Sequence, residues 1–168
     1  MRAAAMRRIA LAAGLALTLA VPALAAPSKT VVVKAAYNKH LKATILVDGS
    51  GKTLYLYTAD RKGVSACRKE GLDCTNIWYP LKAPATAGPG AKASLLGTTA
   101  DGKQATYNGH PLYIFHGCYS GCGLPDTKPG QIYGEGFSYV WWVISPSGNA
   151  IKKTSNAAVP IQTAREKS

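Results

Sequence analysis

A short apolar pattern occurs twice in this 168-residue chain. The first copy, GKTLYLYTAD, begins at residue 51, and the second, GHPLYIFHGC, begins 58 positions later, at residue 109. Each copy starts at a turn glycine and continues as Leu-Tyr-x-aromatic. Each is followed further along by a tryptophan with an aromatic neighbour, at 78–79 and at 141–142. This self-similarity indicates one supersecondary unit used twice.

The two copies alternate aliphatic and aromatic side chains, and successive side chains of a strand point to opposite faces. A strand that is apolar on both faces needs cover on both sides. We therefore expect two repeat units, at about 40–83 and 98–148, that share one aromatic core within a single domain at 26–160. One face would carry Leu54, Leu56, Leu112 and Ile114, and the other would carry Tyr55, Tyr57, Tyr113 and Phe115.

The remaining pattern predicts an all-β fold of short, mostly antiparallel strands joined by glycine turns, at Asp48-Gly49-Ser50-Gly51 and at Asn108-Gly109. Residues 83–93 are rich in Ala, Pro and Gly and are typical of a linker or a long loop. At most one short helical turn is expected, near 75–79, where Thr75 can cap it and Pro80 ends it. The tail at 161–168 is polar and is expected to be disordered. Strands are expected at 30–36, 41–47, 53–58, 104–107, 111–115 and 138–145.

The first 25 residues are typical of a signal peptide: three arginines, an apolar run at 9–21, then Pro22 and the small-x-small site Ala23-Leu24-Ala25. The apolar run is too short to cross the roughly 30 Å hydrocarbon layer of a bilayer. The first cysteine is Cys67, so none follows the cut as a lipid acceptor. The sequence predicts a periplasmic or secreted protein, cleaved near Ala25 and without stable membrane insertion afterwards.

The four cysteines of an exported chain predict two disulfides. They form two close pairs, Cys67 with Cys74 and Cys118 with Cys122. Three connectivities are open on sequence alone, and local pairing is the simplest because a turn glycine lies inside each pair.

Cleavage would remove three of the 20 basic residues and none of the eight acids, leaving 17 against 8 and a net charge of +9. This charge favours an anionic component of the cell envelope as partner. The basic residues never form a run longer than two, which is also typical of an ordinary solvated surface. Nucleic acid is excluded because the chain lacks a basic stripe with interleaved aromatics.

The segments LVDGSGKTLYLYTAD, IWYPLKA, TYNGHPLYIF and WWVISPSG resemble those of bacterial secreted-repeat proteins with a Tyr-x4-Asp motif, also described as predicted lipoproteins with a Yx(FWY)xxD motif. The resemblance covers about residues 40–148. In the first copy Tyr55, Tyr57 and Asp60 complete the motif, whereas in the second Tyr113 and Phe115 match and Cys118 stands in the place of the aspartate. The resemblance implies an exported repeat protein and supplies no biochemical activity.

Two interpretations of the motif remain open. Asp60 can be a turn carboxylate beside packed tyrosines, or a carboxylate and phenol can form a ligand site. The Tyr55 hydroxyl cannot reach Asp60 along one extended strand, so a contact requires a bend or the other repeat. For the ligand site, the sequence suggests an aromatic surface framed by lysines, built from Tyr55, Tyr57, Trp78 and Trp142.

A metal or redox site is the alternative function, because His110, His116, Cys118 and Cys122 fall within 13 residues and suit zinc or copper. Oxidised cysteines cannot act as thiolate ligands, which argues against it. No catalytic constellation is present: the chain has no GxSxG elbow and no acid pair in the context of a glycosidase. The sequence thus favours a non-enzymatic binding or structural protein without a cofactor.

Overall fold

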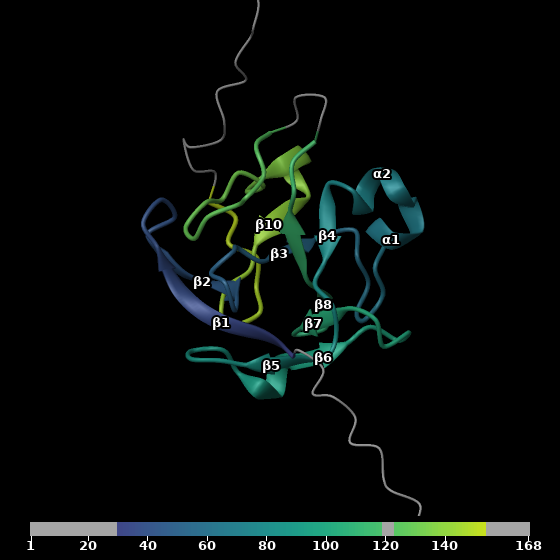
Figure 1. Cartoon of the computed structure of the whole chain (residues 1–168), viewed down its shortest axis with the longest axis horizontal. Helices are drawn as coiled ribbons and strands as arrows, with labels where there is room; N and C mark the ends of the chain where they lie inside the picture. The colour runs from purple at the N-terminus through teal and green to yellow at the C-terminus, as the bar shows by residue number, and fades with distance from the viewer. Residues whose placement is uncertain (1–29, 119–122, 154–168) are drawn as a thin grey trace, which may run out of the picture.

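The computed structural model of the chain describes residues 30–118 and 123–153 (Figure 1). The predicted signal peptide, Cys122 and the predicted tail lie outside these residues. The described part consists of short, mostly antiparallel strands with two single-turn α-helices, so the all-β prediction is confirmed. No helix in the described ranges is long and apolar enough to span a membrane.

The central sheet interlocks the two repeats. Its strands lie in the order β10 (Trp141–Val143), β3 (Tyr55–Tyr57), β9 (Tyr113–Phe115) and β4 (Trp78–Pro80). Strands β3 and β4 come from the first repeat and β9 and β10 from the second, so each pair of neighbours joins different repeats. At the centre Tyr55 lies directly opposite Tyr113. Neither repeat can complete this sheet alone.

Two smaller sheets flank the central one, and each contains a hairpin that corresponds to a hairpin of the other. In the first, β1 (Val31–Asn38) lies between β2 (Ala43–Asp48) and β5 (Ala85–Ala87). In the second, β7 (Ala105–Tyr107) lies between β6 (Leu96–Thr98) and β8 (His110–Pro111). The β1–β2 hairpin corresponds to the β6–β7 hairpin. In Figure 1, β1 and β2 lie on one side of the central sheet and the two helices on the other.

A cycle of three backbone hydrogen bonds occurs once in each half and shows that the halves are equivalent. In the first cycle the Leu46 N–H donates to the Ile144 carbonyl at 2.9 Å and the Ile144 N–H donates to the Leu54 carbonyl at 3.2 Å. The Leu54 N–H closes the cycle by donating to the Leu46 carbonyl at 3.0 Å. In the second, the N–H groups and carbonyls of Ala105, Leu81 and Leu112 repeat the cycle in the same order, at 2.8, 2.9 and 3.0 Å. Each cycle takes two residues from one repeat and the third from the other.

The core has two parts, as the alternation predicts. Leu54, Leu56, Leu112 and Ile114 belong to one apolar cluster with Trp142. The aromatic side chains of the same strands belong to the other, in which the rings of Trp78 and Trp141 stack at 3.8 Å. The shared aromatic core is therefore confirmed.

Three local predictions were wrong. The expected linker at 83–93 contains β5, which pairs in parallel with β1, and leads into the 3₁₀ turn η1 (Ala93–Leu95). The helical turns are α1 (Cys67–Glu70) and α2 (Leu72–Thr75), ahead of the predicted 75–79, because Trp78 pairs with Phe115 in the central sheet. The expected strand at 138–145 is shortened to β10 by the 3₁₀ turn η2 (Phe137–Tyr139).

The disulfide Cys67–Cys74 connects the two short helices, as local pairing predicts. Cys118 is also disulfide-bonded. Its predicted partner, Cys122, lies outside the described residues.

Candidate functional site

The tyrosines and aspartates of the family motif are exchanged between the repeats. The Tyr55 hydroxyl donates a hydrogen bond to Asp126 Oδ2 at 2.5 Å, and the Tyr113 hydroxyl donates to Asp60 Oδ2 at 2.9 Å. Because Tyr55 and Tyr113 lie opposite each other in the sheet, each phenol reaches the turn that follows the other repeat's strand. We call these two contacts the crossed pairs.

Asp126, and not Cys118, is the second-repeat counterpart of Asp60. Each aspartate uses its other oxygen to accept a backbone N–H further along its own turn: that of Ala66 at 2.7 Å for Asp60 and that of Tyr133 at 2.9 Å for Asp126. The correspondence with Cys118 is wrong because the second repeat has extra residues between its strand and its aspartate. The sequence does carry a signal for Asp126, since it is the first acid after β9 and a glycine soon follows it, as after Asp60.

The crossed pairs are structural. Desolvation by burial raises the pKa of Asp60 and of Asp126 to about 6. Burial and the neighbouring carboxylate also raise the pKa of the Tyr55 and Tyr113 hydroxyls above the ordinary value of a tyrosine. At neutral pH the phenols therefore remain protonated donors and the carboxylates acceptors. Tyr55, Tyr113 and Asp126 are buried, so these groups bind each other and are not open to a ligand.

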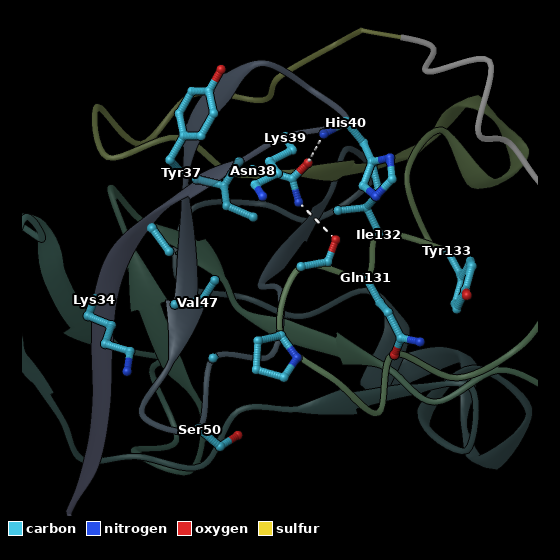
Figure 2. A pocket seen from close by; sticks show the side chains of 15 residues that line it. Lys34, Tyr37, Asn38, Lys39, His40, Val47, Ser50, Gln131, Ile132 and Tyr133 are labelled. Carbon is cyan, nitrogen blue, oxygen red and sulfur yellow. Dashed lines mark hydrogen bonds between the residues drawn. The ribbon is translucent and has the colours of Figure 1, made fainter.

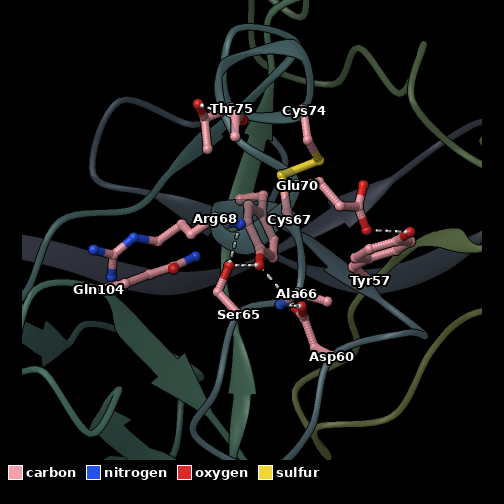
Figure 3. Close-up of a disulfide and its surroundings, with 12 residues drawn as sticks. Tyr57, Asp60, Ser65, Ala66, Cys67, Arg68, Glu70, Cys74, Thr75 and Gln104 are labelled. Atoms are coloured by element: carbon pink, nitrogen blue, oxygen red, sulfur yellow. Dashed lines mark hydrogen bonds between the residues drawn. A yellow bond between two sulfur atoms is a disulfide. The ribbon is translucent and has the colours of Figure 1, made fainter.

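The predicted aromatic surface is not present. Tyr55, Trp78 and Trp142 are buried, and so are Tyr113 and Phe115. Tyr57 is half-buried; its ring stacks on Trp141 at 4.2 Å and its hydroxyl donates to Glu70 (Figure 3). These side chains pack against each other because they fill the shared core.

Three residues of the predicted metal site are described by the structure: His110, His116 and Cys118. His110 is half-buried, and burial lowers its pKa. His116 is exposed and stacks on Tyr79 at 4.2 Å. Cys118 is in a disulfide and cannot supply a thiolate. Within the part of the chain that the structure describes, no three His, Cys, Asp or Glu side chains are grouped to hold a metal ion.

A groove of about 700 Å³ lies between the β1–β2 hairpin and the segment 129–133 (Figure 2). Its apolar lining is supplied by Ala36, Ile45, Val47 and Ile132. Its polar and aromatic lining includes Lys34, Tyr37, Lys39, His40 and Tyr133. No aspartate or glutamate lines it. We call this recess the basic groove.

Buried polar contacts fix both walls of the basic groove. Asn38 is 1% exposed; its Nδ2 donates to the Gly130 carbonyl across the groove at 3.0 Å, and its Oδ1 accepts the N–H groups of His40 and Leu41. The Thr53 hydroxyl donates to the Gln131 carbonyl at 2.6 Å. Because these groups satisfy each other without a ligand, the groove is preformed.

A smaller recess occupies the equivalent place in the other half. It has a volume of about 300 Å³ and lies between the turn after Asp60 and residues 99–101. The Gly63 carbonyl accepts the N–H of Ala100 there, as the Gly130 carbonyl accepts from Asn38. Arg68 and Asp101 form an ion pair at 2.6 Å in its lining. Figure 3 shows the neighbouring Asp60, Ser65 and the disulfide.

Sequence reasoning missed the basic groove. The stretch KAAYNKHLK at 34–42 carries three lysines, a histidine and a tyrosine without an acid, and this signal was available. What the sequence could not supply is the opposite wall, because 129–133 lies about 90 positions further along.

Comparison with protein families gives one match. The model of a family described as a secreted repeat of unknown function matches residues 42–82 and 96–145, together more than half of the chain. No curated protein and no solved structure matches the chain. The matched segments contain both crossed pairs and all four strands of the central sheet. The chain belongs to this family of secreted repeats of unknown function.

Proposed function

We propose that this exported protein is non-enzymatic and binds an anionic component of the cell envelope in the basic groove. The observation that carries the proposal is the lining, which holds Lys34, Lys39 and His40 and no carboxylate. A cleft lined by one sign of charge over low-dielectric walls concentrates ligands of the opposite sign.

The distribution of the remaining charges supports the same ligand. The exposed acids Glu70, Asp73 and Asp101 lie on or beside the helices and the smaller recess, away from the groove lining. Lys42 and Lys128 are exposed close in sequence to the two groove walls. Asp48 lies beside the lining; it is half-buried, and its Oδ1 accepts the Ser50 hydroxyl and the N–H groups of Ser50 and Lys52. An approaching anion therefore meets positive charge on the groove side, and no carboxylate is among the lining residues.

The other ionisable groups support binding over catalysis. The carboxyl groups with raised pKa are Asp60, Asp126 and Glu135, and all three accept hydrogen bonds from the protein's own backbone N–H groups. Burial raises the pKa of Glu135 to about 8. These carboxyl groups hydrogen-bond within the folded domain, and the groove lining supplies no acid to act with His40 in proton transfer.

The test compares the double variant Lys34→Gln/Lys39→Gln with the control Lys82→Gln/Lys103→Gln, which removes two exposed lysines outside the groove lining. Calorimetry would measure binding of an oligogalacturonate, of poly-L-glutamate and of phosphatidylglycerol vesicles at rising salt. We expect binding of at least one probe to weaken about tenfold in the groove variant, about 0.7 kcal/mol per lysine, within the range for exposed ion pairs. The proposal fails if no probe binds at low salt, or if both variants bind equally.

A further inference from the structure

Resting on the proposed function, we infer that the ligand of the basic groove is a chain that carries at least two anionic groups. One anionic group pairs with Lys34 at one end of the groove, while another reaches Lys39 and His40 at the other end. Three features carry this inference: the separation of the lysines, the direction of the Lys34 side chain and the uncharged, fixed lining between the two ends.

The two lysines of the lining belong to opposite ends of the groove. From Lys34 to Asn38, the residue before Lys39, strand β1 rises about 13 Å at its usual spacing. Figure 2 shows Lys34 toward one end of the lining and Lys39 with His40 toward the other. The positive charge is therefore divided between two places along β1.

The Lys34 side chain points away from the other end. Lys34 lies opposite Val47, and its Nζ donates to the Gly49 carbonyl at 3.0 Å. Gly49 lies in the turn after β2, beyond Val47 and away from the β1–β2 connection that carries Lys39. The hydrogen bond leaves two of the three ammonium donors for a ligand. This ammonium therefore serves an anion at its own end only.

The separation decides between a compact anion and a chain. Exposed charges about 13 Å apart are largely screened from each other at physiological salt, where the Debye length is about 8 Å. A compact anion bound at one end therefore gains little from the cation at the other end. A chain that reaches both ends forms two ion pairs, and the second forms at the high effective concentration that linkage provides.

The lining between the two ends is uncharged and keeps its shape. Ala36 lies between Lys34 and Asn38 on β1, opposite Ile45 on β2, and both apolar side chains line the groove. The Asn38 Nδ2 contact with the Gly130 carbonyl fixes the distance between the walls. Because fixed walls cannot close on a small anion, the ligand itself must span the groove. The volume of about 700 Å³ lies within the roughly 300–1,000 Å³ of small-molecule sites and admits a short segment of chain.

The test uses capped peptides in which two glutamates are separated by zero, one, three or five glycines. Three glycines allow the two glutamates to lie about 13 Å apart in an extended chain. A matched monoanionic peptide carries glutamine in place of one glutamate. A second series carries phosphoserine in place of glutamate, so that carboxylate and phosphate ligands are compared at equal spacing. Amide chemical shifts of the full chain, followed during titration at low salt, measure the affinities.

We expect the dianionic peptide with three glycines to bind about fivefold more tightly than the peptide without a spacer and than its monoanionic match. Lys34→Gln and Lys39→Gln should each abolish this advantage, because each variant removes one end of the bridge. Lys82→Gln, at an exposed lysine outside the groove lining, is the matched control and should keep it. We expect the same dependence on the spacer in both series, and the series that binds more tightly identifies the anion as carboxylate or phosphate.

An advantage of the dianionic peptide that survives both lysine variants would overturn the inference. If dianionic and monoanionic peptides bind equally and the lysine variants weaken both, the inference is wrong and the proposed function stands. If no peptide binds, the inference is wrong; if the oligogalacturonate, poly-L-glutamate and vesicles also fail to bind, the proposed function is wrong as well. Because Lys39 is exposed, Lys39→Gln should keep the thermal unfolding midpoint of the parent, which excludes misfolding as the cause.

Discussion

The basic groove and the smaller recess are equivalent positions of the two repeats with different contents. The wall segment Pro129-Gly130-Gln131-Ile132-Tyr133 corresponds residue by residue to Lys62-Gly63-Val64-Ser65-Ala66. Gly130 and Gly63 both adopt a positive φ, 85° and 69°. The last residue of each segment donates its N–H to the aspartate of its crossed pair. The frame is thus the same on both sides.

The differences lie in the hairpin that faces each wall. The β1–β2 hairpin is long and presents Lys34 opposite Val47, whereas in the short β6–β7 hairpin Gly97 takes the place of Lys34, opposite Thr106. The lining of the second recess contains Asp101, which pairs with Arg68, and Lys69, so it holds one acid against two bases, whereas the basic groove holds two lysines and no acid. The repeated residues build the frame, and the residues that are not repeated leave one site open and basic. All of β1 precedes the first family match at 42–82, so the open site draws on residues outside the repeat.

The crossed pairs are equivalent in geometry but not in burial, which predicts the largest difference between the halves. Asp126 is 2% exposed, whereas Asp60 is only half-buried. Asp126→Ala leaves the buried Tyr55 hydroxyl and the partly buried Tyr133 N–H without their acceptor and should lower the free energy of unfolding by about 3 kcal/mol. Asp60→Ala should cost about 1–2 kcal/mol, since water can replace part of the lost contact. Urea denaturation measures both.

Asp73→Ala, at an exposed aspartate, is the control for these two variants. The double variant Tyr55→Phe/Asp126→Ala should cost less than the sum of the single changes, since each removes the same contact. Equal stability of Asp126→Ala and Asp73→Ala would show that the crossed pairs do not hold the repeats together.

Glu135 has no acidic counterpart in the first half and makes stability depend on pH. Its Oε2 accepts the N–H of Val143 at 2.6 Å, and its Oε1 has no hydrogen-bond partner within the described residues. Burial raises its pKa from 4.5 to about 8. The folded state therefore holds this proton more tightly than the unfolded state. Its contribution to stability is complete below about pH 4.5 and is lost as the pH rises through about 8. The raised pKa values of Asp60 and Asp126 have the same effect: the folded state loses stability as the pH rises from about 4 to about 6.

We expect the wild-type protein to be more stable at pH 5 than at pH 8. Glu135→Gln keeps a carbonyl oxygen for the Val143 N–H and carries no charge, so it should raise stability at pH 8 by about 2 kcal/mol and change it little at pH 5. Thermal unfolding at the two pH values measures the effect, with Glu70→Gln at an exposed site as control. A Glu135→Gln protein with the same pH dependence as the wild type would contradict this account.

The ion pair of the smaller recess should contribute least to stability. The side chains of Arg68 and Asp101 are 31% and 42% exposed, so the pair is screened by water. Asp101→Asn should lower the free energy of unfolding less than any of the variants above, because an exposed ion pair contributes little to stability. It should also leave binding at the basic groove unchanged, which calorimetry with the same probes can check. A loss of binding in this variant would show that the two recesses are coupled.

The features of the fold that depend on the repeated pattern could be predicted from the sequence. The alternation around Tyr55 and Tyr113 gave both faces of the core correctly, because it depends only on the period of a strand. The exchange of tyrosines and aspartates was not predictable in detail, since it depends on which strands become neighbours. The extra residues between β9 and Asp126 change the spacing of the motif, so the sequence pattern did not identify Asp126 as the second aspartate. Half of the basic groove was visible as the acid-free stretch at 34–42, but its other wall is set by the distant contact of Asn38 with Gly130.

The central claim is that one of two equivalent recesses binds an acidic ligand and the other does not. Titration of the isotope-labelled protein with trigalacturonate, followed by amide chemical shifts, tests it most directly. We predict saturable shifts in residues 34–50 and 129–133, and none at 62–69 and 97–101. Shifts of similar size in both sets, or in the second set alone, would contradict the account.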